Sequence, residues 1–343
     1  MPTFTSLLEK LQRREDLTVD EAAGAMADVM DGRAASSHIA GLLVGLAMKG
    51  ERPAEIVGLA RAMRARATRL PVAQGTPDVF DTCGTGGDAA GTFNVSTAAA
   101  LVVAACGVPV AKHGNRSVSS RCGSADVFEA LGVKIDATPE VAARCLEQAG
   151  IAFLFAPSFH PSMKHAGPTR RELGIRTAFN LLGPLTNPAG AARQLVGVPR
   201  PELTELVARA LAMLGTTRAW VVHGADGLDE LSTTGYSKVS ECRDGAVNTF
   251  YVHPAEFGLP KAEAADLGGG DAAANAAIIR AILDGAAGAP RDIVLYNAGA
   301  SLLIAGRART LRDGIALGAD AIDSGRARGV LDRLARASQG GTA

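Results

Sequence analysis

The sequence has no excess of charge of either sign, and this balance narrows the classes of function. Its 343 residues include 35 Lys and Arg and 35 Asp and Glu, so the formal net charge at pH 7 is zero. No apolar run reaches the roughly 18 residues that cross a membrane, and the first residues, MPTFTSLLEKLQRRED, carry acids that are not typical of a secretion signal. We therefore expect neither nucleic acid nor a membrane among the partners.

Cysteines and aromatic residues are scarce as well. The five cysteines are odd in number and widely spaced, and no two form a C-x-x-C pair. This pattern disfavours a disulfide framework or a zinc knuckle and favours reduced thiols in a cytoplasmic protein. Aromatic residues make up 4% of the chain, against 47% hydrophobic residues and 40 glycines, which indicates Ala-, Leu- and Val-rich helices packed closely on a sheet.

Residues 1–70 contain helical patterns only. Thr18–Glu21 is a capping box, Ser36 and Ser37 can cap a further helix, and Pro53 suits a helix's first turn. We interpret this region as a small α-helical domain. A unit of this size has little core of its own, so it packs either against the rest of its chain or against a second copy, and these patterns leave both open.

From Val79 onward, expected strands alternate with helices. The strands are expected at 79–84, 108–114, 151–157, 193–198 and 218–224, with a hairpin at 238–252 that turns at Asp244-Gly245. Such alternation is typical of a mostly parallel central sheet flanked by helices. We therefore expect an α/β fold in which residues 75–160 and 190–343 form the larger domain, while the stretch 160–185 returns to the α-helical domain.

A glycine-rich stretch follows the first expected strand. Gly84, Gly86 and Gly87 precede Asp88, and Asn94–Thr97 then opens a long apolar helix. Glycines let a ligand approach bare backbone N–H groups, and a helix N-terminus attracts anions such as phosphate. The spacing is neither that of a P-loop nor that of a dinucleotide fingerprint. By itself, the stretch fits a phosphate site or an ordinary turn between strand and helix.

A second polar loop follows the next expected strand. Lys112–Ser120 offers an ammonium group, a guanidinium group, an amide and several hydroxyls, and Ser124 and Asp126 open the helix after it. Ligands bind at the carboxyl ends of strands in open α/β sheets. Two neighbouring loops that are rich in donors indicate a phosphate-bearing ligand, with a plain surface loop as the alternative.

Carboxylates and an arginine complete the candidates. Asp229 and Glu230 follow a strand, and they either hold Mg²⁺ with water and phosphate oxygens or form a solvated acidic turn. Arg170 either pairs with a planar carboxylate near a cleft or lies on a helix surface. His160 and His165 are spaced five apart, which misses one helix face, so we expect no metal site there.

Four motifs, in this order and at these separations, resemble the anthranilate phosphoribosyltransferase family. They are GTGGD (84–88), FNVST (93–97), KHGNRSVSSRCGSADVFEALGV (112–133) and DGLDEL (226–231), and the likeness covers nearly the whole chain. The resemblance implies the nucleoside phosphorylase/phosphoribosyltransferase fold group and a homodimer formed through the helical domain. It also implies a step of tryptophan biosynthesis: Mg²⁺-dependent direct displacement that moves the phosphoribosyl group of phosphoribosyl pyrophosphate (PRPP) to the amine of anthranilate.

The resemblance further implies roles for individual residues. Contacts with PRPP fall to Gly84, Gly87, Asp88, Thr92, Asn94, Val95, Ser96, Thr97, Lys112, His113, Gly114, Asn115, Arg116, Ser117, Val118, Ser119, Ser120 and Ser124. Anthranilate contacts fall to Gly84, Asn115 and Arg170, with Arg170 opposite the substrate carboxylate. Ser96, Asp229 and Glu230 hold Mg²⁺, two ions per subunit. No residue is implied as general acid, general base or nucleophile, so catalysis rests on positioning and electrostatics.

Two other functions remain compatible with parts of the sequence. A pyrimidine nucleoside phosphorylase shares the fold and a glycine-rich phosphate loop, but it has no need of the Asp229-Glu230 pair. A non-catalytic relative that binds nucleic acid is the second alternative. The zero net charge and the intact set of candidate residues disfavour it.

Overall fold

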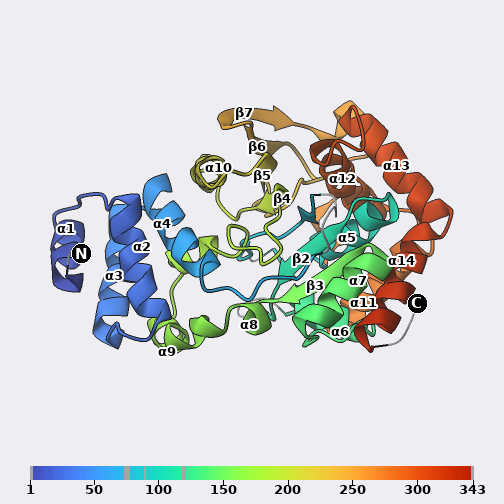
Figure 1. Ribbon diagram of the computed structural model, residues 1–343. Helices are drawn as coiled ribbons and strands as arrows, with labels where there is room; N and C mark the ends of the chain where they lie inside the picture. The colour runs from blue at the N-terminus through green and yellow to red at the C-terminus, as the bar shows by residue number, and fades with distance from the viewer. Residues whose placement is uncertain (1–2, 73–77, 89, 118–120, 341–343) are drawn as a thin grey trace.

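The computed structural model describes residues 3–72, 78–88, 90–117 and 121–340, and these form a helical lobe beside an α/β lobe (Figure 1). The helical lobe begins with α1 (Phe4–Gln12), α2 (Val19–Met30), α3 (Ser36–Lys49) and α4 (Pro53–Arg64). The capping box of Thr18 and Glu21 and the place of Pro53 are confirmed. The predicted serine cap is wrong, because the N-cap of α3 is Ala35 and no side chain caps this helix.

The α/β lobe is built on a seven-stranded sheet in the order β3-β2-β1-β4-β5-β6-β7. Its strands are β1 (Phe80–Asp81), β2 (Val110–Gly114), β3 (Ile151–Phe155), β4 (Arg193–Gly197), β5 (Arg218–Gly224), β6 (Ser237–Arg243) and β7 (Ala246–Val252). The first five strands in this order pair in parallel, and β6 and β7 extend the sheet as an antiparallel hairpin. The hairpin turns at Asp244 and Gly245, with φ of 50° and 82°, as a two-residue turn of this kind requires. The predicted α/β class and mostly parallel sheet are confirmed.

Strand β1 is shorter than the predicted 79–84. The carbonyl oxygen of Thr82 accepts a hydrogen bond of 3.1 Å from Nζ of Lys112 instead of pairing with a neighbouring strand. The chain therefore leaves the sheet directly after Asp81, and the glycine-rich loop begins close to the buried edge of the sheet.

Helices cover both faces of the sheet. The longer helices of this lobe are α5 (Val95–Ala105), α7 (Pro139–Ala149), α10 (Leu203–Met213), α11 (Ala272–Leu283), α12 (Ala289–Ile304), α13 (Leu311–Asp323) and α14 (Arg326–Ser338). The helix α14 packs on both α5 and α7, although these precede it by well over a hundred residues. All of these longer helices except α10 contribute to one large hydrophobic core, which also includes residues of β1, β2 and β3 (Figure 1).

The second hydrophobic core joins the two lobes. On β4 and β5, Leu195 and Trp220 belong to the large core, whereas Val196 and Val221 belong to a core shared with α10 and all four N-terminal helices. Successive strand residues point to opposite faces, which places the two cores on opposite sides of these strands. The helical lobe therefore rests on α10 through α4 and does not form a core of its own.

The chain also contains several short helical elements. They are α6 (Ser124–Ala130), α8 (Ala156–Phe159), η1 (Pro161–His165), α9 (Gly167–Leu173), η2 (Ala178–Leu181), η3 (Pro254–Phe257) and η4 (Ala264–Leu267). Four of them, α8, η1, α9 and η2, lie in the segment that connects the lobes. Of these, η1 contacts α2, and α9 and η2 contact α3. In the ranges that the structure describes, no helix combines the length and apolar character needed to span a bilayer.

Candidate active site

The candidate residues gather where the strand order reverses, at the carboxyl ends of β1 and β4. Neighbouring connections diverge at such a point and leave a crevice for ligands. The N–H of Thr85, in the glycine-rich loop, donates to the Gly197 carbonyl at the end of β4 over 2.9 Å. A Cβ on Gly197 would overlap the backbone of Asp229, and a Cβ on Gly84 would lie 3.2 Å from Oδ2 of Asp229. The absence of side chains at these two glycines thus brings the acidic pair against the loop.

The two carboxylates are held at low exposure and close to other negative charge. Burial is the main cause that raises the pKa of Asp229 to about 7, and the nearby charge of Asp88 contributes to the rise. Burial, then the charge of Asp229, raises the pKa of Glu230 to about 8. An Oε1 atom of Glu230 accepts a hydrogen bond of 3.1 Å from the N–H of Ser96, in the first turn of α5. The acceptor at this helix N-terminus is therefore the protein's own Glu230 carboxyl group.

This arrangement fits a divalent cation. Carboxylates that repel each other at low exposure are stabilised when a cation lies between them. Within the described residues, no three His, Cys, Asp or Glu side chains converge as a metal-binding group. Mg²⁺ suits such a site because it takes one or two protein carboxylates and completes its shell with water and phosphate oxygens. Asp229, Glu230 and the hydroxyl of Ser96 are the protein groups that would hold it.

Lys112 faces the same helix start from β2. Its side chain is almost wholly buried, at 2% exposure. The ammonium Nζ donates to the carbonyl and hydroxyl oxygens of Thr82 over 3.1 and 3.0 Å, and to the hydroxyl of Ser96 over 3.3 Å. Among the described residues, the hydrogen bonds of this ammonium thus go to neutral oxygens, while its charge also acts on the nearby carboxyls of Asp81 and Glu230 and opposes the rise of their pKa. A buried positive charge of this kind can attract a phosphate group.

His113, the next residue, is buried and turned toward the connecting segments. Its Nδ1 lies 3.0 Å from the Gly183 carbonyl oxygen, and its ring centroid lies 5.1 Å from that of His160. Burial lowers the pKa of His113 to about 3 and that of His160 to about 4. Both imidazoles are therefore neutral near pH 7 and form part of the wall between the lobes.

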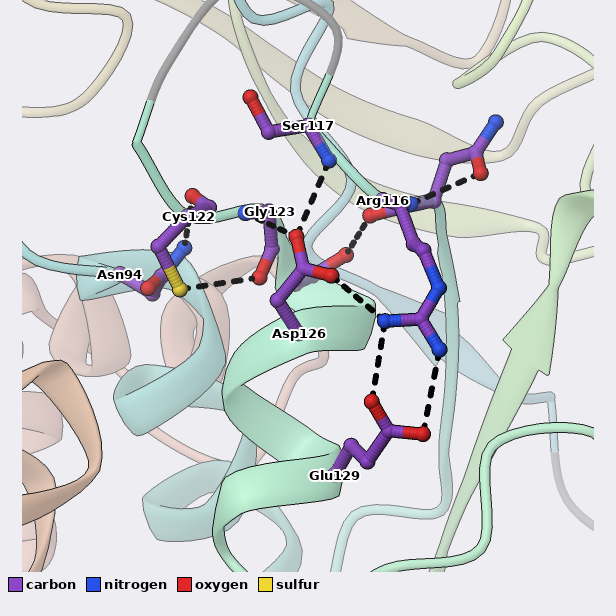
Figure 2. A network of polar contacts seen from close by, with 9 residues as sticks. Asn94, Arg116, Ser117, Cys122, Gly123, Asp126 and Glu129 are labelled. Atoms are coloured by element: carbon purple, nitrogen blue, oxygen red, sulfur yellow. Dashed lines mark hydrogen bonds and ion pairs between the residues drawn. The ribbon is translucent and has the colours of Figure 1, made fainter. Parts of the chain in front are cut away.

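The loop after β2 is anchored by Asp126 (Figure 2). This carboxylate accepts hydrogen bonds from the N–H groups of Gly123 and Ser117, over 2.8 and 3.2 Å, and pairs with the guanidinium of Arg116 at 2.8 Å. Arg116 also pairs with Glu129 at 3.0 Å. The predicted contacts Val118, Ser119 and Ser120 lie outside the described residues.

Two further contacts fasten this loop to its surroundings. The hydroxyl of Ser124 donates to the Asn115 carbonyl over 3.4 Å, and a Cβ on Gly114 would overlap the Ser124 hydroxyl. Asn94 donates from Nδ2 to the Cys122 carbonyl over 3.2 Å (Figure 2). Asn94 thus ties the start of α5 to the loop and makes no side-chain cap, although its residue type suits one.

The remaining PRPP candidates differ in exposure. Gly87 is exposed, Asp88 and Thr92 are half-buried, and Thr92 forms an isolated bridge with Gly268. Val95 and Thr97 are buried, and the N–H of Thr97 donates to the Asn94 carbonyl over 3.1 Å. At the start of α5, it is therefore the side chains of Asn94 and Ser96 that contribute to the surface of the site.

Arg170 lies apart from these groups, in α9. Its guanidinium carbon is 4.9 Å from the ring centroid of Phe179, and burial lowers its pKa. Among the described residues, no hydrogen bond or ion pair joins it to Gly84 or Asn115. The structure thus places Arg170 against Phe179 of the connecting segments, without a bond to either of the other predicted anthranilate contacts.

Three further residues that shape the site, Arg176, Asp81 and Asn187, were not predicted from the sequence. The Arg176 guanidinium donates to the Gly86 carbonyl over 2.7 Å and covers Gly87, where a Cβ would overlap it. Asp81, fully buried, accepts from the His113 N–H over 3.2 Å and from Nδ2 of Asn187 over 2.6 Å. Only Arg176 carries a signal in the sequence, as a further arginine six residues after Arg170 in the same Pro-rich stretch.

The fold and its donor-rich switch point place the chain among the α/β transferases that bind phosphorylated ligands. Comparisons with known proteins refine this class. Residues 5–67 match the helical bundle domain of the glycosyl transferase family, and residues 76–328 match its a/b domain. The anthranilate phosphoribosyltransferase of Moorella thermoacetica is 56% identical over 327 residues, which cover 95% of this chain and 96% of that one.

Solved structures agree with the sequence relatives. The crystal structure of anthranilate phosphoribosyltransferase from Thermus thermophilus aligns with a TM-score of 0.90 at 45% identity, covering 97% of this chain and 99% of that one. The Saccharomyces cerevisiae enzyme in complex with PRPP and Mg aligns with a TM-score of 0.89 at 26% identity, over 98% of both chains. The chain belongs to the anthranilate phosphoribosyltransferase family.

Proposed function

We propose that this chain transfers the phosphoribosyl group of PRPP to the amine of anthranilate and releases pyrophosphate, as a step of tryptophan biosynthesis. One observation carries the proposal: the glycine-rich loop, the start of α5, Lys112 and the Asp229-Glu230 pair meet at one point of the sheet edge. The family membership and the PRPP and Mg of the yeast structure support the same substrates for this chain.

The anionic donor meets three kinds of group. The glycine-rich loop contacts the donor through Gly84, Gly87 and Asp88, and Asn94–Thr97 hold its phosphates at the start of α5. Lys112 and the loop through Ser120 bind the same ligand, and Ser124 closes the site. Mg²⁺, when bound at Ser96, Asp229 and Glu230, neutralises negative charge on the departing pyrophosphate. We assign two ions per subunit, with Ser96 at one and both carboxylates chiefly at the other. The low exposure and mutual repulsion of the carboxylates support this assignment.

The reaction itself asks little of acid or base groups. The aromatic amine of anthranilate is neutral near pH 7 and attacks C1′ directly, while the bond from C1′ to pyrophosphate breaks and the ribose passes through an oxocarbenium-like state. The nitrogen, which becomes positively charged as its bond to C1′ forms, then releases one proton to solvent or to the departing pyrophosphate. The chain holds amine and C1′ in line, and such positioning lowers the barrier by several kcal/mol. Lys112 adds preorganised positive charge where negative charge grows. No covalent enzyme intermediate forms.

Anthranilate occupies the wall between the lobes in this proposal. Arg170 faces its carboxylate, and Gly84 and Asn115 contact it where the two substrates meet. The neutral imidazole of His113 and the ring of Phe179 give this wall the apolar character that an aromatic ring requires.

The proposed domains follow the contacts of the connecting segments. Residues 1–70 with 160–185 form the helical domain, and residues 75–160 with 190–343 form the α/β domain. Contacts of α3 with α9 and η2 support the return of 160–185 to the helical domain. We further propose a cytoplasmic homodimer joined through the helical domain. The half-exposed apolar residues of α1 and α3 and the exposed Met48 support this face.

The test uses the fluorescence of anthranilate. We expect the fluorescence to fall when PRPP is added with Mg²⁺ and to persist when Mg²⁺ is withheld. Persistent fluorescence with both present, together with phosphorolysis of thymidine, would replace the proposal with a pyrimidine nucleoside phosphorylase. Tight DNA binding without anthranilate turnover would replace it with a non-catalytic relative.

A further inference from the structure

Asn297 lies in the middle of α12 and is fully buried. A buried side-chain amide lowers the stability of the fold unless it finds hydrogen-bond partners. Its partners lie 66 residues away, on the segment that carries the acidic pair. The Oδ1 atom accepts from the N–H of Leu231 over 3.0 Å, and Nδ2 donates to the carbonyl of Leu231 over 2.9 Å. The second hydrogen of Nδ2 points to the Ile293 carbonyl, also at 2.9 Å.

The residue that Asn297 holds is the one after Glu230. Leu231 belongs to no helix or strand, so its two backbone groups have no ladder to join. A buried backbone needs a partner for each N–H and C=O, and the amide of Asn297 supplies both at once. The bond to the N–H restrains the peptide between Glu230 and Leu231, and the bond to the C=O restrains the peptide that follows Leu231. Together they hold the backbone directly after Glu230, from which its side chain is presented.

The same segment is held at its other end by different groups. The carboxylate of Asp226 accepts from the hydroxyls of Ser232 and Thr234, each over 2.6 Å, and the Gly224 N–H donates to the Leu228 carbonyl over 2.8 Å. Gly197 receives the Asp229 backbone at van der Waals contact. Several contacts thus restrain the backbone of residues 228–231. Among them, Asn297 binds the residue that directly follows Glu230.

We propose that Asn297 is a positioning residue that presets the Asp229-Glu230 pair for the divalent cation before the cation and PRPP arrive. This inference rests on the proposed function, because it assumes that the pair holds the metal. Asn297 touches neither substrate nor metal. It acts through the Leu231 peptide, in the way that outer groups orient metal ligands and raise the affinity of a site.

The first test measures Mn²⁺ binding, as a probe for Mg²⁺, by the loss of the free-ion electron paramagnetic resonance signal in the presence of PRPP. We expect Asn297→Ala to raise the dissociation constant by about tenfold or more, the size typical of a lost outer-shell contact. Ser301→Ala is the matched control. Ser301 is equally buried one turn along α12, and its hydroxyl bonds only the Asn297 carbonyl at 2.8 Å. We expect this control to change the dissociation constant by less than about twofold.

Glu230→Gln separates failure of this inference from failure of the proposed function. If Glu230→Gln weakens Mn²⁺ binding and a folded Asn297→Ala does not, the positioning role is wrong and the metal site stands. If neither variant weakens binding, the metal assignment is wrong and the inference falls with it. An equal loss in Ser301→Ala overturns the inference, because the effect then belongs to α12 in general.

A second measurement needs no variant and covers the case in which Asn297→Ala does not fold. Amide hydrogen exchange of Leu231 in the wild-type protein reports directly on its N–H bond to Asn297. We expect strong protection in the absence of any divalent cation and little further gain when Mg²⁺ and PRPP are added. Free exchange without the cation, followed by protection with it, would show that the pair is ordered by its ligands and would overturn the proposal.

Discussion

Two walls of the site carry opposite charge and are held by different kinds of contact. The acidic wall is the segment 228–231 with Asp229 and Glu230, and the basic wall is the end of β2 and the loop after it, with Lys112 and Arg116. On the acidic wall, Asn297 and the Asp226 carboxylate hold the backbone of residues 228–231, and in the described part of the chain the carboxylates of Asp229 and Glu230 meet no cation within ion-pair distance. On the basic wall, Arg116 is matched by its own carboxylates, Asp126 and Glu129. The charge of the acidic wall is therefore open to a cation, whereas on the basic wall Arg116 is occupied by carboxylates and Lys112 makes its hydrogen bonds, in the described part of the chain, with neutral oxygens.

The sharpest way to break this contrast is to neutralise the acidic wall. Asp229→Asn combined with Glu230→Gln removes both charges, and we expect kcat/KM to fall by at least about 10³-fold, since a metal supplies several kcal/mol of stabilisation to the transition state. The Mg²⁺ dependence of the remaining rate should vanish. Steady-state rates across a Mg²⁺ series measure both effects. An unchanged Mg²⁺ dependence would mean that the metal lies elsewhere.

A second change moves the acidic wall and leaves its charge intact. Gly197→Ala places a Cβ where the Asp229 backbone now lies, so the segment must shift. We expect kcat/KM to drop by about 10²-fold, because misplacement of a catalytic group by about an ångström has that effect. Gly24→Ala in α2 is the control, since its Cβ would meet no atom within 4 Å. Equal activity of the two variants would show that the position of Asp229 is not critical.

The basic wall should respond to a single substitution. Lys112→Met keeps the length of the side chain and removes the buried charge, and we expect about a 10²-fold lower kcat/KM for PRPP. The KM for anthranilate should change much less. Kinetics with each substrate varied in turn distinguish the two. A loss shared equally between both substrates would assign Lys112 a general structural role.

Arg176 contributes to the site from the connecting segment, and its loss should have a smaller effect. Arg176→Ala frees the Gly86 carbonyl and uncovers Gly87, and we expect about a tenfold higher KM for PRPP, the loss of one charge-assisted hydrogen bond. Arg171→Ala is the control, as an exposed arginine of α9. If both variants bind PRPP as the wild type does, Arg176 only covers the loop.

The smallest effect concerns stability and pH. In the folded protein the pKa values of Asp229 and Glu230 lie above their ordinary values, so the unfolded chain releases these protons at lower pH than the folded one. The free energy of unfolding without metal should therefore fall as pH rises from about 4 through about 8, and Mg²⁺ should reverse the loss at the alkaline end. We expect shifts of a few degrees in Tm. The variant Asp229→Asn with Glu230→Gln should lack the slope above about pH 6.5, since Asp81, His113 and His160, whose pKa values burial also shifts, account for pH dependence below it. A slope above about pH 6.5 that persists in the variant would assign the effect to other groups.

Periodicity and turn chemistry predicted most of the fold. The parallel strands after β1 and the hairpin at Asp244-Gly245 follow from local patterns of a few residues, and the structure has them where they were expected. The extent of β1 could not be predicted in this way. The Thr82 carbonyl leaves the ladder for Lys112, thirty residues later, and no local pattern records such a partner.

The residues of the candidate site likewise fall into those that a local pattern reveals and those that matter only through contacts with distant parts of the chain. Residues in glycine-rich or charged motifs, such as Gly84, Lys112 and Glu230, stand out because their residue types are unusual after a strand. Gly197 and Asn297 do not stand out, because each matters only through the Asp229 or Leu231 backbone that another part of the chain brings against it. Asn94 has a residue type that suits a helix cap, but its side chain donates a hydrogen bond to the Cys122 carbonyl instead.

The packing of α14 over α5 and α7 has a consequence for synthesis on the ribosome. The strands β1, β2 and β3 are made early, but the helix that completes their cover is made some two hundred residues afterwards. At ordinary rates of translation this delay lasts on the order of ten seconds or more. During that interval the apolar faces of α5 and α7 are exposed to chaperones and proteases, and the nascent chain becomes a finished folding unit only when α14 has emerged.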